Sequence, residues 1–280
     1  MPTFSAPDGT ALAYHLDGEG PPLICLPGGP TDSAYLGDLG GLTAHRRLVR
    51  LDLRGTGASA SPADPGSLRC DRLVDDVEAL REHLGLPRVD LLAHCAGANL
   101  ALLYALRHPE RIRRLVLVTP SVRAVGLTVP GELRVETVRP RAEEPWFPGA
   151  FEALRSLVSG EPAEGAWEAV APFSYGRWDA AARAHHAATE ERTDPAVVAA
   201  YGAEGAFDPD AVRSGLSGLD LPVLLLAGAV DPGAPPRTTA ELAALLPRAR
   251  TVVQSGASHH PWLDGPERFR TAVAEFLTAA

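Results

Sequence analysis

Short apolar runs alternate with helical segments along most of the chain, and this alternation limits the fold more than any other feature. Buried strands are expected at PPLICL, RRLVRLDL, RVDLLAH, IRRLVLVTP, LPVLLLAG and RARTVVQS. Helices are expected over residues 71–84, 95–107 and 266–279, the first because its apolar residues recur at helical spacing. Strands that alternate with helices on a short repeat favour an α/β fold with a mostly parallel sheet flanked by helices.

Two segments depart from this alternation. Residues 3–18 alternate polar and apolar residues around Asp8-Gly9, which predicts a β-hairpin. Residues 121–215 carry helical pieces rich in Pro, Gly, Glu and Ala, without a convincing buried strand, and hold Trp146, Trp167 and Trp178. We therefore expect a core formed by residues 1–120 and 216–280, with residues 121–215 inserted as a helical cap over one end of the sheet.

Composition restricts the partners and the compartment. The 280 residues are 45% hydrophobic and 22% charged, which is ordinary for a globular protein, and the net charge of −9 argues against nucleic acid or an anionic membrane as partner. Three cysteines without a CxxC spacing predict neither a disulfide framework nor a zinc cluster. No signal-peptide pattern and no apolar stretch of ~18 residues occurs. We expect a cytoplasmic protein without a membrane partner.

Reactive side chains follow three of the expected strands. Cys95 follows RVDLLAH where the strand runs directly into a helix, Asp231 follows LPVLLLAG, and His259 follows RTVVQSGAS. Ligands of open parallel sheets bind outside the carboxyl ends of the strands, so these groups are expected at one rim. A nucleophile, an acid and a base are what acyl transfer requires. Taken alone, Cys95 would instead be interpreted as a small buried apolar residue.

Five segments together resemble a known family. They are LPGGP, LDLRGTGAS, LLAHCAGANLALLYALRHPERIRRLVLVTP, LLLAGAVDPGAP and GASHHPWLDGPERF. The sequence is similar to the α/β-hydrolase family, and most to its capped members related to proline iminopeptidases and to small esterases and lactonases. The chain order Cys95, Asp231, His259 agrees with the family order of nucleophile, acid and base.

The resemblance implies a role for each member of this set. Cys95 lies at the nucleophile elbow, where the family has G-x-S-x-G and residues 93–97 read AHCAG. Cysteine therefore replaces the usual serine, either as a native nucleophile or as an introduced serine-to-cysteine change. His259 stands where the family pattern has the base, and Asp231 matches the acid.

The resemblance also implies the surroundings of this set. The oxyanion amides would be those of Gly29 and Ala96, and Pro27 stands where a histidine is common. Trp262 follows the base closely enough to help wall the substrate pocket, and the cap sets specificity. No metal and no organic cofactor is implied.

Alternatives to these assignments remain. His260 is the other candidate for the base, with His259 then a packing residue. Asp231 is alternatively a cap of its own loop, and Asp220 is a weaker candidate for the acid because it precedes its strand. The acids of residues 121–215 are either solvated surface or, as in the iminopeptidase relatives, holders of a substrate amine; they are Glu143, Glu144, Glu190, Glu191 and Glu204.

Three functions fit the sequence. The first is an acyl hydrolase or transferase that acts on a small ester, thioester, lactone or amide through an acyl-enzyme at Cys95. The acyl-enzyme would be a thioester, which amines and thiols attack readily, so transfer competes with hydrolysis. The second is an aminopeptidase of the iminopeptidase type. The third is a ligand-binding protein on this fold with little catalysis, which the replaced serine and the missing loop histidine suggest.

Overall fold

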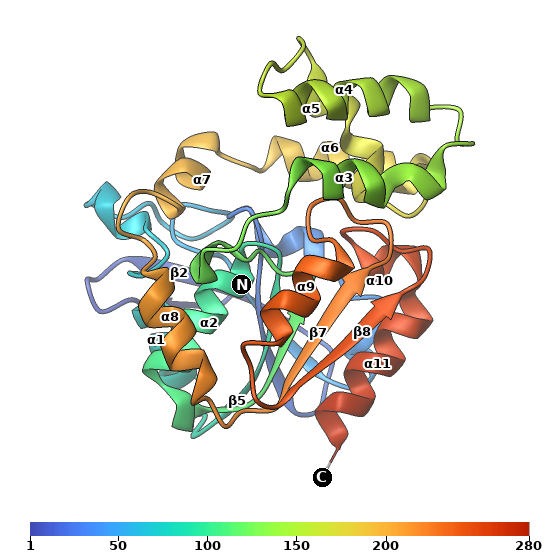
Figure 1. Ribbon diagram of the computed structural model, residues 1–280. Coiled ribbons are helices and arrows are strands. Elements are labelled where there is room, and N and C mark those ends of the chain that lie inside the picture. The colour runs from blue at the N-terminus through green and yellow to red at the C-terminus, as the bar shows by residue number, and fades with distance from the viewer. Residues whose placement is uncertain (280) are drawn as a thin grey trace.

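A computed structural model describes residues 1–279 and shows a sheet of eight strands in the order β1-β2-β4-β3-β5-β6-β7-β8 (Figure 1). The pairs β1–β2 and β2–β4 are antiparallel, and every other pair is parallel. The sheet confirms the predicted α/β fold. The strands are β1 Thr3–Ser5, β2 Ala11–Asp17, β3 Pro22–Leu26, β4 Arg47–Leu51, β5 Val89–His94, β6 Ile112–Val118, β7 Val223–Gly228 and β8 Ala249–Gln254.

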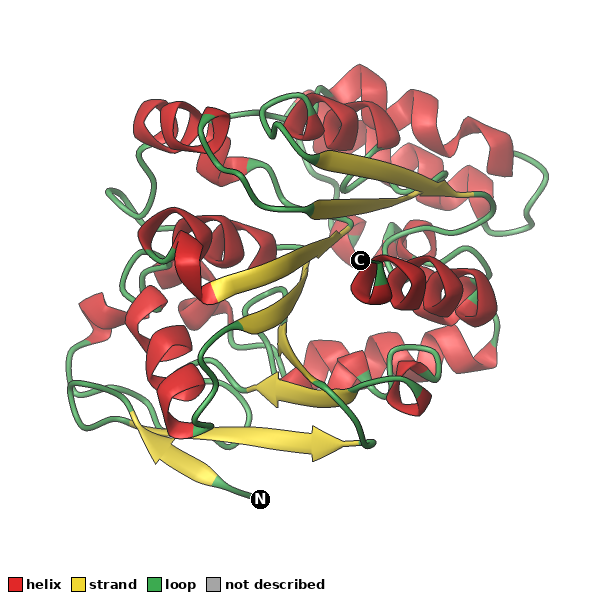
Figure 2. Ribbon diagram, turned by 90° about the horizontal axis from the view of Figure 1, so that it is seen from below, coloured by secondary structure: helices red, strands yellow, loops and turns green. Residues whose placement is uncertain are grey.

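Helices cover both faces of this sheet (Figure 2). The predicted hairpin at Asp8-Gly9 and the predicted helices near residues 71, 95 and 266 are confirmed as the β1–β2 pair, α1, α2 and α11. The helices are α1 Val74–His83, α2 Gly97–Arg107, α3 Gly131–Val138, α4 Phe147–Ser159, α5 Ala166–Ala169, α6 Ala180–Glu191, α7 Pro195–Tyr201, α8 Pro209–Ser217, α9 Pro236–Ala243, α10 Pro261–Asp264 and α11 Pro266–Thr278.

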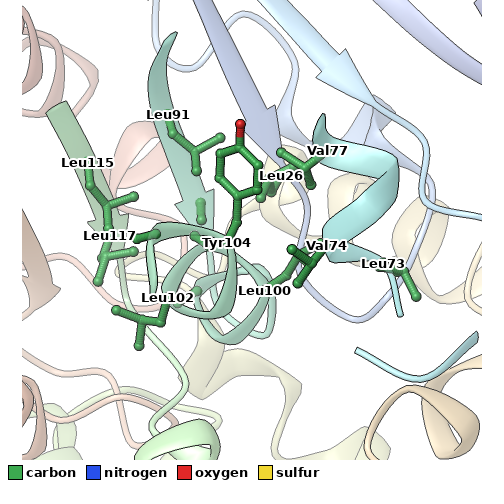
Figure 3. Packing of buried hydrophobic residues seen from close by; sticks show 14 of the residues in the cluster. Leu26, Leu73, Val74, Val77, Leu91, Leu100, Leu102, Tyr104, Leu115 and Leu117 are labelled. Atoms are coloured by element: carbon green, nitrogen blue, oxygen red, sulfur yellow. The ribbon is translucent and has the colours of Figure 1, made fainter. Parts of the chain in front are cut away.

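The larger apolar cluster lies between the sheet and helices α1, α2 and α8. In the view of Figure 3, Tyr104 of α2 stands between Leu91 of β5 and Val77 of α1, and all three are fully buried. Strand β5 is buried at all six positions because helices cover both faces of the parallel sheet. This packing fixes the place where β5 passes into α2.

A second cluster covers the opposite face of the sheet. It joins α11 to the β-strands through Phe269 and Val273, and it includes Trp262 of α10 and Tyr35 from the connection after β3. Burial of large side chains on both faces stabilises the sheet by about 1.5–3 kcal/mol per side chain. The loops at the carboxyl ends of the strands therefore rest on a rigid support.

The segment between β6 and β7 is helical, as the sequence predicts. Helices α3 to α6 form a layer at the top of Figure 1, and α3 to α5 enclose a small apolar cluster of their own around Phe147, Leu154 and Phe173. Helix α8 behaves differently, because Val212 and Leu216 belong to the main core. The expected boundary at residue 215 falls inside this helix. No helix within residues 1–279 has the length and apolar character needed to cross a bilayer.

Candidate active site

Cys95 occupies the sharp turn between β5 and α2. Its backbone has a φ of 49°, in the left-handed region that residues with a side chain seldom adopt. The strain is held by backbone hydrogen bonds, since Cys95 N–H donates to Val118 O at 3.0 Å and Ser121 N–H donates to Cys95 O at 3.0 Å. The thiol is partly exposed and lies at the N-terminus of α2, where the helix dipole favours a negative charge.

Two glycines permit the close packing of this turn. A Cβ on Gly97 would lie 2.5 Å from Pro27 O, so α2 approaches the loop after β3 only without a side chain there. A Cβ on Gly28 would lie 2.7 Å from the Cβ of Cys95. The loop after β3 is therefore pressed directly against the turn that carries the thiol.

Asp231 and His259 come together across the loops after β7 and β8. His259 Nδ1 lies 2.8 Å from Asp231 Oδ2, and the other carboxylate oxygen accepts the Gly233 N–H at 2.7 Å. Asp231 thus caps its own loop, one of the alternatives considered above, and holds the imidazole as well. Asp220 does not take part, because it lies on the surface in an ion pair with Arg248.

Asp231 and Cys95 both affect the pKa of the His259 imidazole. Burial alone would lower the pKa of the imidazole, but the Asp231 carboxylate and the Cys95 thiol outweigh burial and raise that pKa well above its usual value. Cys95 and Asp231 therefore both influence the charge of this ring. His260 lies elsewhere: its Nδ1 donates to Ser174 O at 3.1 Å, and its ring stacks on Tyr175 at 4.7 Å. Of the two candidate bases, His259 is the one that faces Asp231.

The backbone amides expected to bind an oxyanion lie on the two segments that flank the thiol. Among the described residues, neither the Gly29 N–H nor the Ala96 N–H donates to another protein group. The neighbouring Gly28 N–H is already used, because it donates to the hydroxyl of Tyr35 at 2.6 Å. The amides of Gly29 and Ala96 are therefore available beside Cys95.

A buried hydrogen-bond chain joins this loop to the backbone of His259. The Tyr35 hydroxyl accepts from Gly28 N–H and so donates its proton to His94 Nδ1, at 2.7 Å. His94 Nε2 lies 2.9 Å from His259 O, and since a carbonyl only accepts, Nε2 carries the ring proton. Thr119 Oγ1 donates to the same carbonyl at 3.0 Å. This series of hydrogen bonds requires a neutral His94, and burial lowers the pKa of this ring well below its usual value.

A cavity of about 540 Å³ lies between helices α3 to α5 and the loop after β7. Most of its wall is apolar, with Leu154, Leu157 and Phe173 among the contributors, and it reaches His259 and Asp231. Trp262 does not wall this cavity, contrary to the sequence-based expectation. Its ring is 1% exposed and packs edge-on against His94 at 4.8 Å, because α10 turns it down into the core beneath the site.

Comparison with known proteins decides the family. A family model described as the alpha/beta hydrolase fold matches residues 21–266. The chain belongs to the α/β-hydrolase family.

Sequence similarity between this α/β-hydrolase and its relatives covers nearly its whole length. The proline iminopeptidase of Heyndrickxia coagulans is 26% identical, over 94% of this chain and 92% of that protein. The 2-hydroxymuconate semialdehyde hydrolase of Pseudomonas putida is 28% identical, over 95% and 90% respectively. The solved enol-lactonase of Burkholderia xenovorans has a TM-score of 0.70 at 25% identity, covering 99% of this chain and 100% of that chain. The protein is an α/β-hydrolase enzyme.

Several polar groups near the site of this α/β-hydrolase escaped the sequence analysis. Tyr35 lies in a short 3-10 helix, Ser33–Leu36, after β3. Tyr201 of α7 donates its hydroxyl proton to Ala96 O at 2.8 Å, and Arg134 of α3 lines the cavity beside His259. None of them belongs to a recognisable motif, so only their contacts reveal them. The hydrolase shows no cluster of three His, Cys, Asp or Glu side chains suited to a metal ion within residues 1–279.

Proposed function

We propose that this hydrolase cleaves small esters, thioesters, lactones or amides through a covalent acyl-enzyme on Cys95, with His259 as base and Asp231 as the acid that holds it. The hydrogen bond between Asp231 and His259 supports this most strongly, and the effect of Cys95, which raises the pKa of the same ring, agrees with it. The names of the relatives, an iminopeptidase and an enol-lactonase among them, agree with a carboxylic acid derivative as substrate.

The proposed reaction has two halves. The Cys95 sulfur, its proton taken by His259, attacks the carbonyl carbon, and the oxyanion collects charge against the Gly29 and Ala96 amides. The bond to the leaving group then breaks, the leaving group takes the proton from His259, and a thioester remains on Cys95. Water, or an amine, alcohol or thiol, gives its proton to His259, attacks the thioester and releases the acyl group.

Mass spectrometry tests the covalent step directly. Incubation with 4-nitrophenyl acetate should add one acetyl group to Cys95, and iodoacetamide should alkylate the same residue. Burial raises the pKa of Cys25 and of Cys70 to about 12, so both stay protonated at neutral pH and serve as internal controls.

Substitution of the nucleophile completes the test. Cys95→Ala should abolish adduct formation and turnover while the fold, measured by circular dichroism, is retained. Full turnover in Cys95→Ala, or acetylation of another residue together with loss of activity when that residue is replaced, would refute the proposed role. Cys95→Ser should retain measurable esterase activity because a serine fills the same turn.

An aminopeptidase of the iminopeptidase type is the second candidate, favoured by the near full-length similarity to the Heyndrickxia enzyme. Such an enzyme must hold the α-ammonium group of its substrate. Turnover of proline 4-nitroanilide that is lost when the proline nitrogen is acetylated would select this function. Equal turnover of both compounds, or of neither while esters are cleaved, would select the acyl hydrolase.

A further inference from the structure

Besides the imidazole of His259, the cavity wall contains one basic side chain, that of Arg134 on α3. Arg134 is half-buried, and its Nη1 donates to Pro232 O at 3.0 Å. Within residues 1–279 this is the only hydrogen bond of the guanidinium group, and no Asp or Glu forms an ion pair with it. A guanidinium has five N–H donors, so most of its hydrogen-bonding capacity is unused by the protein.

The one carboxylate in the same wall does not neutralise this charge. Both oxygens of Asp231 are engaged, one with the Gly233 N–H and the other with His259. Burial lowers the pKa of Arg134, with Asp231 opposing that effect, yet an arginine stays charged in a protein. The cavity therefore presents a partly desolvated positive charge without a partner of its own.

The rest of the cavity wall favours binding of a carboxylate by this guanidinium. Aliphatic and aromatic side chains surround it, with Val129, Leu157 and Phe173 among them, and they offer no competing acceptor. A carboxylate bound by a guanidinium in such surroundings forms charge-assisted hydrogen bonds, often two in parallel. A neutral amide of the same shape gains much less, and an ammonium group is repelled.

The position of the cavity indicates which part of a substrate enters it. Its wall includes the imidazole of His259 but not Cys95. In the proposed reaction His259 delivers its proton to the leaving group, which must therefore depart on the imidazole side.

We propose that the cavity binds a leaving group that carries a carboxylate, and that Arg134 recognises this carboxylate. This inference rests on the proposed acyl-transfer function for the identity of the leaving group. It makes anionic aryl or alkyl esters, or lactones with a free carboxylate, better substrates than their neutral counterparts. It also disfavours the aminopeptidase alternative, because no glutamate from residues 121–215 faces this cavity.

Binding to the catalytically inactive Cys95→Ala protein tests recognition without catalysis. The ligands are 3-hydroxybenzoate and its neutral analogue 3-hydroxybenzamide, measured by titration calorimetry. We expect the carboxylate to bind about tenfold more tightly, a preference that Arg134→Gln abolishes and Arg134→Lys partly keeps. Arg155→Gln makes the same change of charge on the exposed face of α4 and should leave the preference intact. Equal binding of the two ligands, or a preference that survives Arg134→Gln, would overturn the proposal.

Kinetics on the enzyme with Cys95 intact distinguish two roles of Arg134. One is recognition of the substrate carboxylate, and the other is support of the loop that contains Pro232. In 3-acetoxybenzoate the ester C–O bond breaks, the acetyl group moves to the Cys95 sulfur, and 3-hydroxybenzoate leaves with a proton. Arg134→Gln should raise KM about tenfold for this ester and leave 3-acetoxybenzamide unchanged. An equal loss on both esters would assign Arg134 to holding the Pro232 loop and overturn the proposal. Failure of acetylation at Cys95, with the binding preference intact, would overturn the proposed function instead.

Discussion

The loops of the core and the helical segment above them use their polar groups differently. In the core loops, each of the three side chains proposed to react sits in a network of hydrogen bonds. The backbone of Cys95 bonds to Val118 and Ser121. The carboxylate of Asp231 bonds to Gly233 and His259, and His259 O accepts from His94 and Thr119. In the segment of α3 to α5, a small apolar cluster supports the helices, and the guanidinium of Arg134 faces the cavity with a single hydrogen bond. The core therefore holds the side chains proposed to react in place, whereas the helical segment leaves most N–H donors of one guanidinium free beside a cavity.

The largest effect is expected where a core contact is removed. Asp231→Asn should lower kcat/KM about 10³-fold, because the amide cannot balance the charge of a protonated His259. The measurement is steady-state hydrolysis of 4-nitrophenyl acetate. Asp220→Asn is the matched control on the surface and should leave the rate unchanged. A rate insensitive to Asp231→Asn would contradict the role of this carboxylate.

Alanine substitutions at two helical glycines allow the packing of the core and of the helical segment to be compared through their effects on stability. Gly97→Ala should destabilise the protein by up to about 3 kcal/mol, because the new Cβ would lie 2.5 Å from Pro27 O in the core. Gly149→Ala in α4 meets no atom within 4 Å and should be stabilising, by up to about 1 kcal/mol. Urea denaturation of both variants measures this difference. Equal effects would show that the two regions are packed alike.

Acid should weaken the boundary between the two regions. His94 of β5, His185 of α6 and His260 lie around Tyr35 and Tyr175, and burial lowers the pKa of all three imidazoles. Their unfolded forms bind protons that the folded forms do not, so stability should fall as pH drops through about 6.5.

One neighbouring group opposes this acid effect. The pKa of His259 is raised in the folded protein, so its contribution is complete below pH 6.5 and is lost only as pH rises through the folded value. The net loss of unfolding free energy between pH 7.5 and 5.5 should be about 2 kcal/mol, measured by urea denaturation. His260→Phe should reduce this loss, and a stability that is flat or rises in acid would contradict the assignment.

The smallest effect is expected from a hydroxyl that touches no reacting atom. Tyr35→Phe removes the bridge between Gly28 N–H and His94 Nδ1 and should lower kcat about fivefold with little change in KM. Tyr175→Phe removes a hydroxyl that contacts His185 of α6, at 2.8 Å, and should leave kcat unchanged. A loss in KM alone, or the same loss in both variants, would show that the Tyr35 chain does not position the core loops.

Much of the core was predictable because its signals are local. Apolar runs and helical spacing indicated the buried strands and helices α1, α2 and α11, and the residues after the strands indicated Cys95, Asp231 and His259. Parallel strands place their carboxyl ends at one edge, so three residues far apart in the chain were expected together. The resemblance to the α/β-hydrolase family added the order of their roles.

The sequence by itself thus determined the order of the strands and helices along the chain and the side chains at the rim, since both follow from periodicity and from positions next to strands. Only the tertiary structure decided that Trp262 packs beneath the site, that α8 joins the core, that Tyr35 and His94 link two loops, and that Arg134 faces the cavity. These contacts join segments that are far apart in the sequence, through helix packing or through single hydrogen bonds. Neither leaves a periodic pattern in the sequence, because each depends on where distant elements meet.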